Sequence, residues 1–316
     1  MAAKAVSAHS AGNASLGRRI FARWQLYLLL LLPIAWLITF AYIPMGGLVL
    51  AFKTYKPNLG VWGSPWVGMK NFNVFLSSYK FSMVLRNTLT ISLYALFIGF
   101  PIPIIFALLL NTMPGRRYKK IIQTVTYIPY FFSTVVMVGI LFQLIDPRNG
   151  LYGTLGKLLT GTTPANLLAR GENFKHLYVW SGVWQSTGYS AIIYIAALSN
   201  ADPFLHEAAM IDGASRFQRV LHIDIPCILP TVSTMLVLAV GNIMKVGHEK
   251  VLLMQNDLNK NYSEIISTYS YKVGLASGVP NFAQSTAIGL FNSVINFILL
   301  VIANFSSKKL NGSGIF

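Results

Sequence analysis

The stretch DPFLHEAAMIDGASRFQRVLHIDIPCILP (residues 202–230) lies between two strongly apolar segments and predicts two short helices joined at a glycine. Asp202 followed by Pro203 is a typical helix start, because the aspartate can cap the helix and the proline lacks only an amide that would have no partner. Gly213 suits the left-handed residue that follows a helix end.

The second short helix has start and stop signals of its own. Ser215 followed by Gln218 matches a capping box, in which each side chain pairs with the other residue's main chain. Pro226 is expected to end this helix. Two capped helices between apolar segments indicate a contact surface for another protein.

The composition is that of an integral membrane protein. Hydrophobic residues make up 54% of the 316 residues and charged residues only 11%, against about 25% charged residues in average soluble domains. The net charge of +16 is spread through the segments between apolar stretches, which fits anionic lipid headgroups and not the single basic surface of a nucleic-acid-binding protein. The single cysteine, Cys227, excludes an internal disulfide and a cysteine-based metal cluster.

Apolar segments near the length of about 20 residues that crosses a bilayer predict an all-α integral membrane protein. Six such segments cover residues 26–52, 85–110, 121–145, 177–198, 229–254 and 283–305. We therefore expect six transmembrane helices within a domain of residues 25–306, flanked by tails of residues 1–24 and 307–316.

Basic residues beside the span ends predict the orientation. They cluster at Arg18, Arg19 and Arg23, at Arg116, Arg117, Lys119 and Lys120, at Arg216 and Arg219, and at Lys308 and Lys309. Because lysine and arginine are enriched in short cytoplasmic loops, we expect both tails and the stretch 202–230 on the cytoplasmic side.

No pattern in the chain predicts catalysis. GLYGTLGKLL (residues 150–159) looks like a phosphate loop, but it has one residue too many between Gly150 and Gly156, and Lys157 precedes a leucine where serine or threonine is needed. The histidines lack metalloprotease spacing, and the sequence has no GxSxG elbow. We expect no metal, no cofactor and no enzymatic activity in this chain, so any ATP would be bound by another chain.

Polar residues within the spans are candidates for a transport path. Lys245 and Glu249 are expected to face each other on the fifth span, either as a gate or cavity wall or as an ion pair at the membrane interface. Asn292 and Asn296 repeat this spacing on the sixth span, with Asn242 on the fifth. These asparagines could form hydrogen bonds between helices or line a polar path.

The fourth span carries Trp184, Gln185 and Tyr189. Aromatic faces beside amide groups suit a sugar ring, which has an apolar CH face and a rim of hydroxyl groups. The alternative is an aromatic belt at the membrane interface, which fits Tyr189 poorly.

The motifs of this chain resemble those of the membrane subunit (permease) of a bacterial ABC importer. The family has a Glu-Ala-Ala motif followed by a glycine and an Ile-x-Leu-Pro ending, matched here by Glu207-Ala208-Ala209, Asp212-Gly213, Phe217 and residues 223–226 (IDIP). Ile225 stands where leucine is usual. RWQLYLLLLLP, RNTLTIS, YIPYFFSTVVMVGIL and EKVLLMQN are similar to the polysaccharide and oligosaccharide subgroup associated with lipoproteins, so that the resemblance covers residues 20–316.

The resemblance implies a type I importer permease fold of six transmembrane helices in the bacterial cytoplasmic membrane. Residues 202–226 would form a cytoplasmic coupling helix segment, in which Glu207, Ala208, Ala209, Asp212, Gly213 and Phe217 engage a separate ATPase dimer. ATP and Mg²⁺ would be bound by that ATPase. The other implied partners are a second, non-identical permease, an extracytoplasmic solute-binding lipoprotein and an oligosaccharide substrate.

Two alternatives stay open at this stage. The Glu-Ala-Ala motif alone would also allow an ABC permease for another solute, such as a peptide. A stand-alone secondary transporter belongs to a different class and commonly has repeated halves with broken helices, which the six unrepeated segments do not show.

Overall fold

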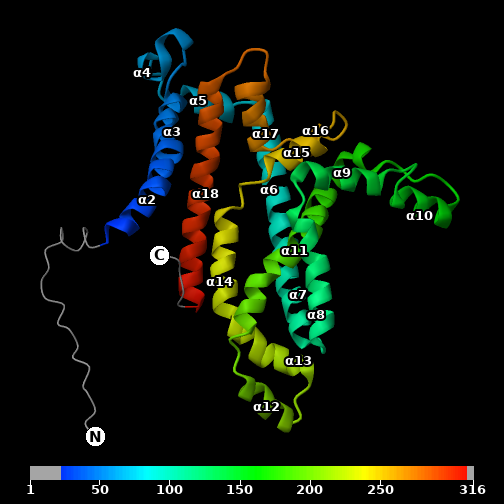
Figure 1. Ribbon diagram of the computed structural model, residues 1–316. Helices are drawn as coiled ribbons and strands as arrows, with labels where there is room; N and C mark the ends of the chain where they lie inside the picture. Colours follow the sequence, from blue (N-terminus) through cyan, green and yellow to red (C-terminus); the bar gives the residue numbers. More distant parts are fainter. Residues whose placement is uncertain (1–22, 312–316) are drawn as a thin grey trace, which may run out of the picture.

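The computed structural model describes residues 23–311 of the chain. This part is helical apart from connecting segments and one isolated bridge between Lys53 and Trp66, which confirms the all-α class. Figure 1 shows an elongated bundle with α4 (Gly60–Gly63) at one end and α12 (Pro203–Ile211) at the other. These are called the α4 end and the α12 end below. The predicted tail of residues 1–24 lies almost wholly outside the described residues.

The first span is a helix that stands apart from the bundle. It is a continuous rod of 29 residues made of α2 (Trp24–Leu37), η1 (Ile38–Tyr42), α3 (Ile43–Met45) and η2 (Gly46–Phe52). No residue of α2 is buried, and α2 diverges from the other helices in Figure 1. At its other end η2 packs against α18 (Phe282–Asn311).

The second span is continuous through its prolines, whereas the third span is bent. α6 (Tyr79–Gly99) and α7 (Pro101–Thr112) form one span of 34 residues, since Pro101 occupies the first turn of α7. The third predicted span, residues 121–145, is divided into two helices: α8 (Arg116–Tyr127) with η4 (Ile128–Phe131) is bent by 107° from α9 (Thr134–Ile145). A new helix starts there because the Ser133 hydroxyl caps the amide of Val136.

The fourth span, α11 (Phe174–Leu198), lies in the centre of the bundle and packs against α6, α7, α8 and α14 (Ile225–Gly241). This position explains why its sequence is the most polar of the six segments. Buried clusters lie on both sides of its middle: one contains Ile91, Phe174 and Val251, and the other contains Ala107, Tyr194 and Ile228.

The fifth span corrects two predictions. α13 (Arg216–Arg219), η7 (Val220–Asp224) and α14 form one helix of 26 residues, so Pro226 does not end the second short helix. The wider π turn of η7, in which the Ile225 amide reaches the Val220 carbonyl, accommodates the proline just after it. The span also ends at Gly241 and not at residue 254, because a non-helical break separates α14 from α15 (His248–Met254).

The remaining helices are short, apart from α18. They are η3 (Pro57–Leu59), α5 (Lys70–Leu76), α10 (Leu151–Thr160), η5 (Leu167–Ala169), η6 (Gly171–Asn173), α16 (Lys260–Ser263), α17 (Ile266–Tyr271) and η8 (Lys272–Ala276). The buried Glu264 carboxylate joins two of these segments to α6 through Lys80 (3.4 Å) and Lys272 (3.1 Å). α18 continues through residue 306, the predicted domain boundary, to Asn311.

Four helices of the described chain are long and apolar enough to cross a membrane, or five if the bent α8–α9 pair counts as one span. α11 is not among them, although it is 25 residues long. The number six stays a prediction, with α11 as the sixth candidate.

α8 and α11 approach each other through a glycine. A Cβ atom at Gly188 of α11 would lie 2.3 Å from the main-chain oxygen of Thr126 in α8. Only glycine allows this distance between two helix backbones.

We predict that Gly188→Ala destabilises the protein by about 1–3 kcal/mol, because the added methyl group must push α8 and α11 apart. The thermal midpoint of the detergent-solubilised protein, followed by size-exclusion chromatography, measures this effect. Gly289→Ala on α18 is the matched control, since its Cβ would meet nothing within 4 Å. Equal midpoints for the two variants would contradict the prediction.

Candidate functional site

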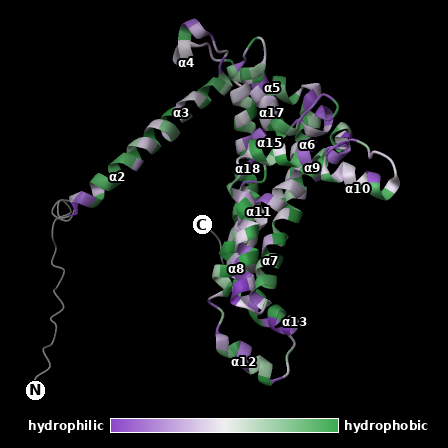
Figure 2. Cartoon of the chain, turned by 45° about the vertical axis from the view of Figure 1, so that its right-hand side comes forward, coloured by the Kyte–Doolittle hydropathy of each residue, from purple (hydrophilic) through white to green (hydrophobic). Residues whose placement is uncertain are grey.

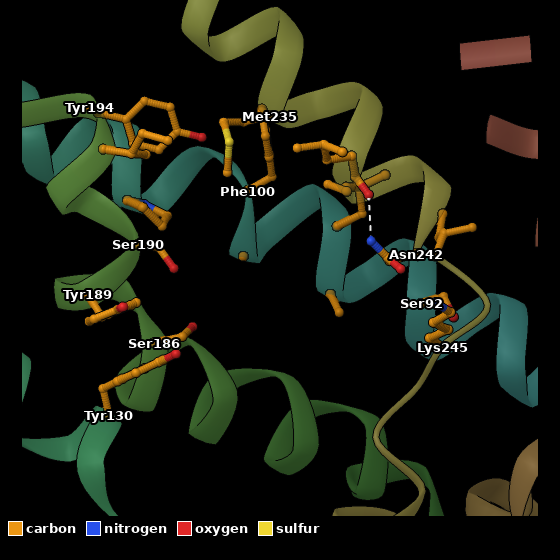
Figure 3. Close-up of a pocket in the computed structure, with 18 of the residues that line it drawn as sticks. Ser92, Phe100, Tyr130, Ser186, Tyr189, Ser190, Tyr194, Met235, Asn242 and Lys245 are labelled. Atoms are coloured by element: carbon orange, nitrogen blue, oxygen red, sulfur yellow. Dashed lines mark hydrogen bonds between the residues drawn. The ribbon is translucent and has the colours of Figure 1, made fainter. Parts of the chain in front are cut away.

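A cavity of about 960 Å³ lies in the middle of the bundle. Its walls come from α6, α7, η4, α11, α14 and the break after Gly241. In Figure 3, the side chains of Tyr130, Ser186 and Tyr189 gather on one side and those of Ser92, Asn242 and Lys245 on another. The space between the spans is therefore mixed in character, with an aromatic and hydroxyl-rich side and a side that carries a cation.

Two parallel tyrosines form the aromatic side. The rings of Tyr130 (η4) and Tyr189 (α11) are stacked with centroids 3.7 Å apart and an angle of 4° between their planes. Ser186 and Ser190 lie on the same helix as Tyr189 and also line the cavity. A flat ring beside hydroxyl groups can contact a sugar's CH face and exchange hydrogen bonds with its hydroxyl rim.

Lys245 is the only charged residue among those that line the cavity. It lies in the break after α14, and it makes no ion pair within the described part of the chain. Glu249 lies in the first turn of α15, so the prediction that the two face each other on one helix is wrong. Asn242, at the end of α14, lines the same cavity, and its amide donates to the Leu238 carbonyl.

The asparagines of the sixth span support the break and do not line the cavity. The side-chain oxygen of Asn296 accepts from the Met244 amide at 3.0 Å, and the Asn292 amide donates to the Met244 carbonyl at 3.4 Å. Of the two interpretations that the sequence left open, the contacts correspond to hydrogen bonding between helices.

Two of the fourth-span candidates lie outside the cavity wall. The Gln185 amide donates to the Phe132 carbonyl at 3.2 Å, at the bend between η4 and α9. Trp184 is half exposed and is not among the lining residues. Of the predicted path residues, Tyr189, Asn242 and Lys245 line the cavity.

The two helices expected from residues 202–230 begin where predicted, at the α12 end, although the second, α13, continues through η7 into α14. Asp202 caps α12 through the Phe204 amide (2.9 Å), and Ser215 and Gln218 make both hydrogen bonds of the capping box. Gly213 has φ = +77°, in the left-handed region that glycine allows. These local signals were all predicted correctly.

The pair presents an exposed apolar surface around the Glu-Ala-Ala motif. Phe204, Leu205, Met210, Ile211 and Phe217 are all exposed, with Ile211 87% and Phe217 74% accessible. Glu207 and Ala208 are exposed between them, Ala209 is half-buried, and Asp212 ends α12. Figure 2 shows that α12 lies beyond the bundle. Exposed apolar side chains gathered on one element mark a surface for protein contact.

A polar cluster joins α12 to the spans. Asp224 of η7 is 1% exposed, and its Oδ1 lies 3.3 Å from Nε2 of His206 and 3.2 Å from the Asn111 amide. Lys119 of α8 donates to the Asn111 carbonyl at 2.9 Å. We call Asn111, His206 and Asp224 the α12 cluster; it lies beside a polar cavity of about 300 Å³.

Sequence reasoning missed Tyr130, Ser186, Ser190 and the α12 cluster. Tyr130 is brought to Tyr189, and Asn111 to Asp224, by contacts between distant segments. Only the aspartate inside an apolar run, at residue 224, gave a signal that could have been followed.

Comparison with protein families decides the class. Residues 99–312 match the family model of the binding-protein-dependent transport system inner membrane component. The chain belongs to this family. The resemblance stated from the Glu-Ala-Ala motif is confirmed: the protein is a membrane subunit of an ABC importer.

Individual relatives of this permease cover nearly its whole length. It is 40% identical to Protein LplB of Bacillus subtilis, over 93% of this chain and 91% of that protein. It is also 40% identical to the polygalacturonan/rhamnogalacturonan transport system permease protein YteP of the same organism, over 92% of this chain and 90% of that protein. Its fold is similar to a chain of a solved bacterial alginate ABC transporter in complex with an alginate-pentasaccharide-bound periplasmic protein, with a TM-score of 0.86, 34% identity, and coverage of 95% and 99% of the two chains.

We predict that Asn296→Leu destabilises the permease by about 1–3 kcal/mol, because the buried amide of Met244 would lose its acceptor. The thermal midpoint measures the change. Ser293→Ala on the same helix is the control, since the Ser293 hydroxyl bonds only the Gly289 carbonyl one turn away. Equal thermal midpoints for Asn296→Leu, Ser293→Ala and the parent protein would contradict the role given to Asn296.

Proposed function

We propose that this permease carries an oligosaccharide or polysaccharide fragment across the bacterial cytoplasmic membrane by alternating access, driven by a separate ATPase. The observation that carries the proposal is the cavity, where the Tyr130–Tyr189 stack stands beside serine hydroxyl groups at the centre of the bundle. The volume of about 960 Å³ is enough for a few sugar rings. The names of the relatives, which refer to polygalacturonan, rhamnogalacturonan and alginate, support a carbohydrate substrate.

The substrate we favour is an acidic glycan. Lys245 brings one cation to a cavity wall without any acidic neighbour in that wall. A uronate ring held against the tyrosines could direct its carboxylate toward the side of the cavity that carries Lys245 (Figure 3). Charge-assisted hydrogen bonds of this kind contribute about 1.5–3 kcal/mol.

We predict that Lys245→Gln lowers uptake of a uronate oligosaccharide at sub-saturating concentration by about tenfold or more. Uptake of the same oligosaccharide with its carboxyl groups reduced to alcohols should be unchanged. Transport into proteoliposomes that contain the assembled importer, with its binding protein added, measures both. Lys245→Arg, which keeps the charge, is the control.

The two substrates separate the possible outcomes. An equal loss for the charged and the reduced oligosaccharide would show a general defect and would overturn the role of Lys245. Unchanged uptake of both would do the same, while leaving the carbohydrate class of the substrate intact.

We further propose that the α12 end faces the cytoplasm. The basic clusters at the start of α8, in α13 and at the end of α18 lie toward this end (Figure 1), as the positive-inside rule requires. The exposed apolar surface of α12 and α13 would then seat in a groove of an ATPase dimer that binds ATP and Mg²⁺. A second, non-identical permease and an extracytoplasmic solute-binding lipoprotein would complete the importer.

The α12 cluster is our candidate for the link between ATPase and cavity. His206 is adjacent to the exposed Glu207, but its imidazole contacts the buried Asp224 carboxylate inside the bundle. Asp224 lies in the π turn that leads into α14, and Asn111 lies in the last turn of the span formed by α6 and α7. A displacement of α12 would therefore act on two cavity walls through three side chains.

We predict different defects for substitutions at two neighbouring residues: loss of ATPase binding in one and loss of coupling in the other. Glu207→Lys should prevent co-purification of the ATPase, because it places an opposite charge in the centre of the contact surface. His206→Ala should retain the ATPase but lower the amount of sugar transported per ATP hydrolysed by several-fold. His206→Gln, which keeps a hydrogen-bond donor, should restore much of that ratio.

Parallel assays of ATP hydrolysis and transport in proteoliposomes give the ratio. A normal ratio in His206→Ala would contradict the linking role. Normal ATPase binding by Glu207→Lys would contradict the contact surface.

A further inference from the structure

α10 carries a continuous stripe of exposed leucines. Leu151, Leu155, Leu158 and Leu159 follow the spacing of one helix face, and all are exposed. Leu158 and Leu159 are 79% and 81% accessible. Such a stripe on a short helix in water would be unfavourable, so something covers it.

The glycines of the false phosphate loop lie on the opposite face and fix how α10 is held. A Cβ at Gly153 would lie 2.3 Å from the Pro147 oxygen, and one at Gly156 would lie 2.7 Å from the Pro164 side chain. The Tyr152 hydroxyl donates to the Ala165 carbonyl at 3.2 Å. The returning segment of residues 161–166 therefore lies against the glycine face.

The position of this returning segment shows which way the leucines point. In Figures 1 and 2 the segment passes α10 on the side toward the α4 end, while α10 itself extends sideways from the bundle. The leucine face, opposite to the glycines, is therefore directed back toward the level of the spans. A soluble protein that approaches the α4 end would meet the returning segment and not the leucines.

α10 also lies close to the end of α9, the second part of the bent α8–α9 pair. α9 ends at Ile145, and only residues 146–150 separate it from α10; five residues reach at most roughly 18 Å. The Asp146 carboxylate accepts from the amides of Asn149 (2.7 Å) and Arg148 (2.8 Å), which closes this turn and holds the pKa of Asp146 below its ordinary value. On the other side of the turn, Leu144 in the last turn of α9 is exposed, so an apolar side chain precedes the leucine stripe of α10.

We propose that α10 is an interfacial membrane helix, whose leucine face rests in the acyl chains of the leaflet at the α4 end. The occupant we infer is lipid, because the face points toward the level of the spans and α10 follows the last turn of α9, where Leu144 is exposed. Lys157 lies off the leucine stripe, where its ammonium can reach lipid phosphates. In this arrangement the bilayer surface holds the arm of residues 146–173 in place.

Spin labels can test this placement in the assembled protein. Cys227 is the only cysteine, so Cys227→Ser gives a background for single labelling sites. Leu158→Cys, Leu159→Cys and Lys157→Cys would each carry a nitroxide in the full chain, purified with its co-purifying subunits in nanodiscs of phosphatidylethanolamine and phosphatidylglycerol. Power saturation then compares collisions with oxygen, which concentrates in acyl chains, and with a water-soluble nickel chelate.

We expect the ratio of oxygen to nickel accessibility to be several-fold higher at residues 158 and 159 than at residue 157. Nickel accessibility at the leucine positions that equals the value at residue 157 would show a water-exposed face and overturn the proposal. Nickel and oxygen accessibility that are both low would show a protein neighbour, such as a second permease, and would overturn it too. Two independent leucine positions guard against failure of one variant to fold.

Discussion

The cavity depends on a helix that stops inside the bundle. A span that is interrupted at membrane depth leaves main-chain groups without partners, and each of them is costly unless another part of the protein supplies a hydrogen bond. Here the carboxamides of Asn296 and Asn292 bind both main-chain groups of Met244, so that α14 can end at Gly241. Because it ends there, the chain beyond it turns aside and brings Asn242 and Lys245 to the cavity wall. The only cation of that wall is therefore positioned by a pair of neutral amides on another span.

A second interruption serves the opposite wall in the same way. The bend between η4 and α9 frees the Phe132 carbonyl, which accepts from Gln185 of α11. This bond keeps η4 beside α11, where Tyr130 stacks on Tyr189. A third irregular turn, the π turn before α14, lies toward the α12 end. Its Asp224 carboxylate contacts His206 and Asn111. In each case a polar side chain that looks out of place in an apolar segment stabilises an irregular turn.

These irregular turns mark the limit of prediction from the sequence. The caps at Asp202, Ser215 and Gly213 were predicted because each uses neighbours within a few residues. The end of the fifth span was not. Asn242 and Lys245 were noticed as polar residues but were placed on a continuous helix, because the acceptor for Met244 lies 52 residues further along the chain. Pro226 was wrongly predicted to end a helix, because no local sequence signal marks the π turn that accommodates this proline. The Tyr130–Tyr189 stack could not be predicted, because no sequence pattern indicates that these two segments are in contact.

The contact of Gly188 with Thr126 has a consequence for selectivity. It joins α8 and α11 without an intervening side chain, close to where each helix leads to one tyrosine of the stack. The stacked pair is therefore a preorganised platform, which costs little conformational entropy when a ligand arrives. On the facing wall the main chain is held at Met244, but the Lys245 side chain is exposed and makes no ion pair within the described part of the chain, so this side chain can adjust to a ligand. A cavity with one rigid and one adaptable wall would be selective for one sugar ring of the ligand and would tolerate variation in the adjacent rings. Such a division suits a transporter whose ligands share one type of sugar but differ in length.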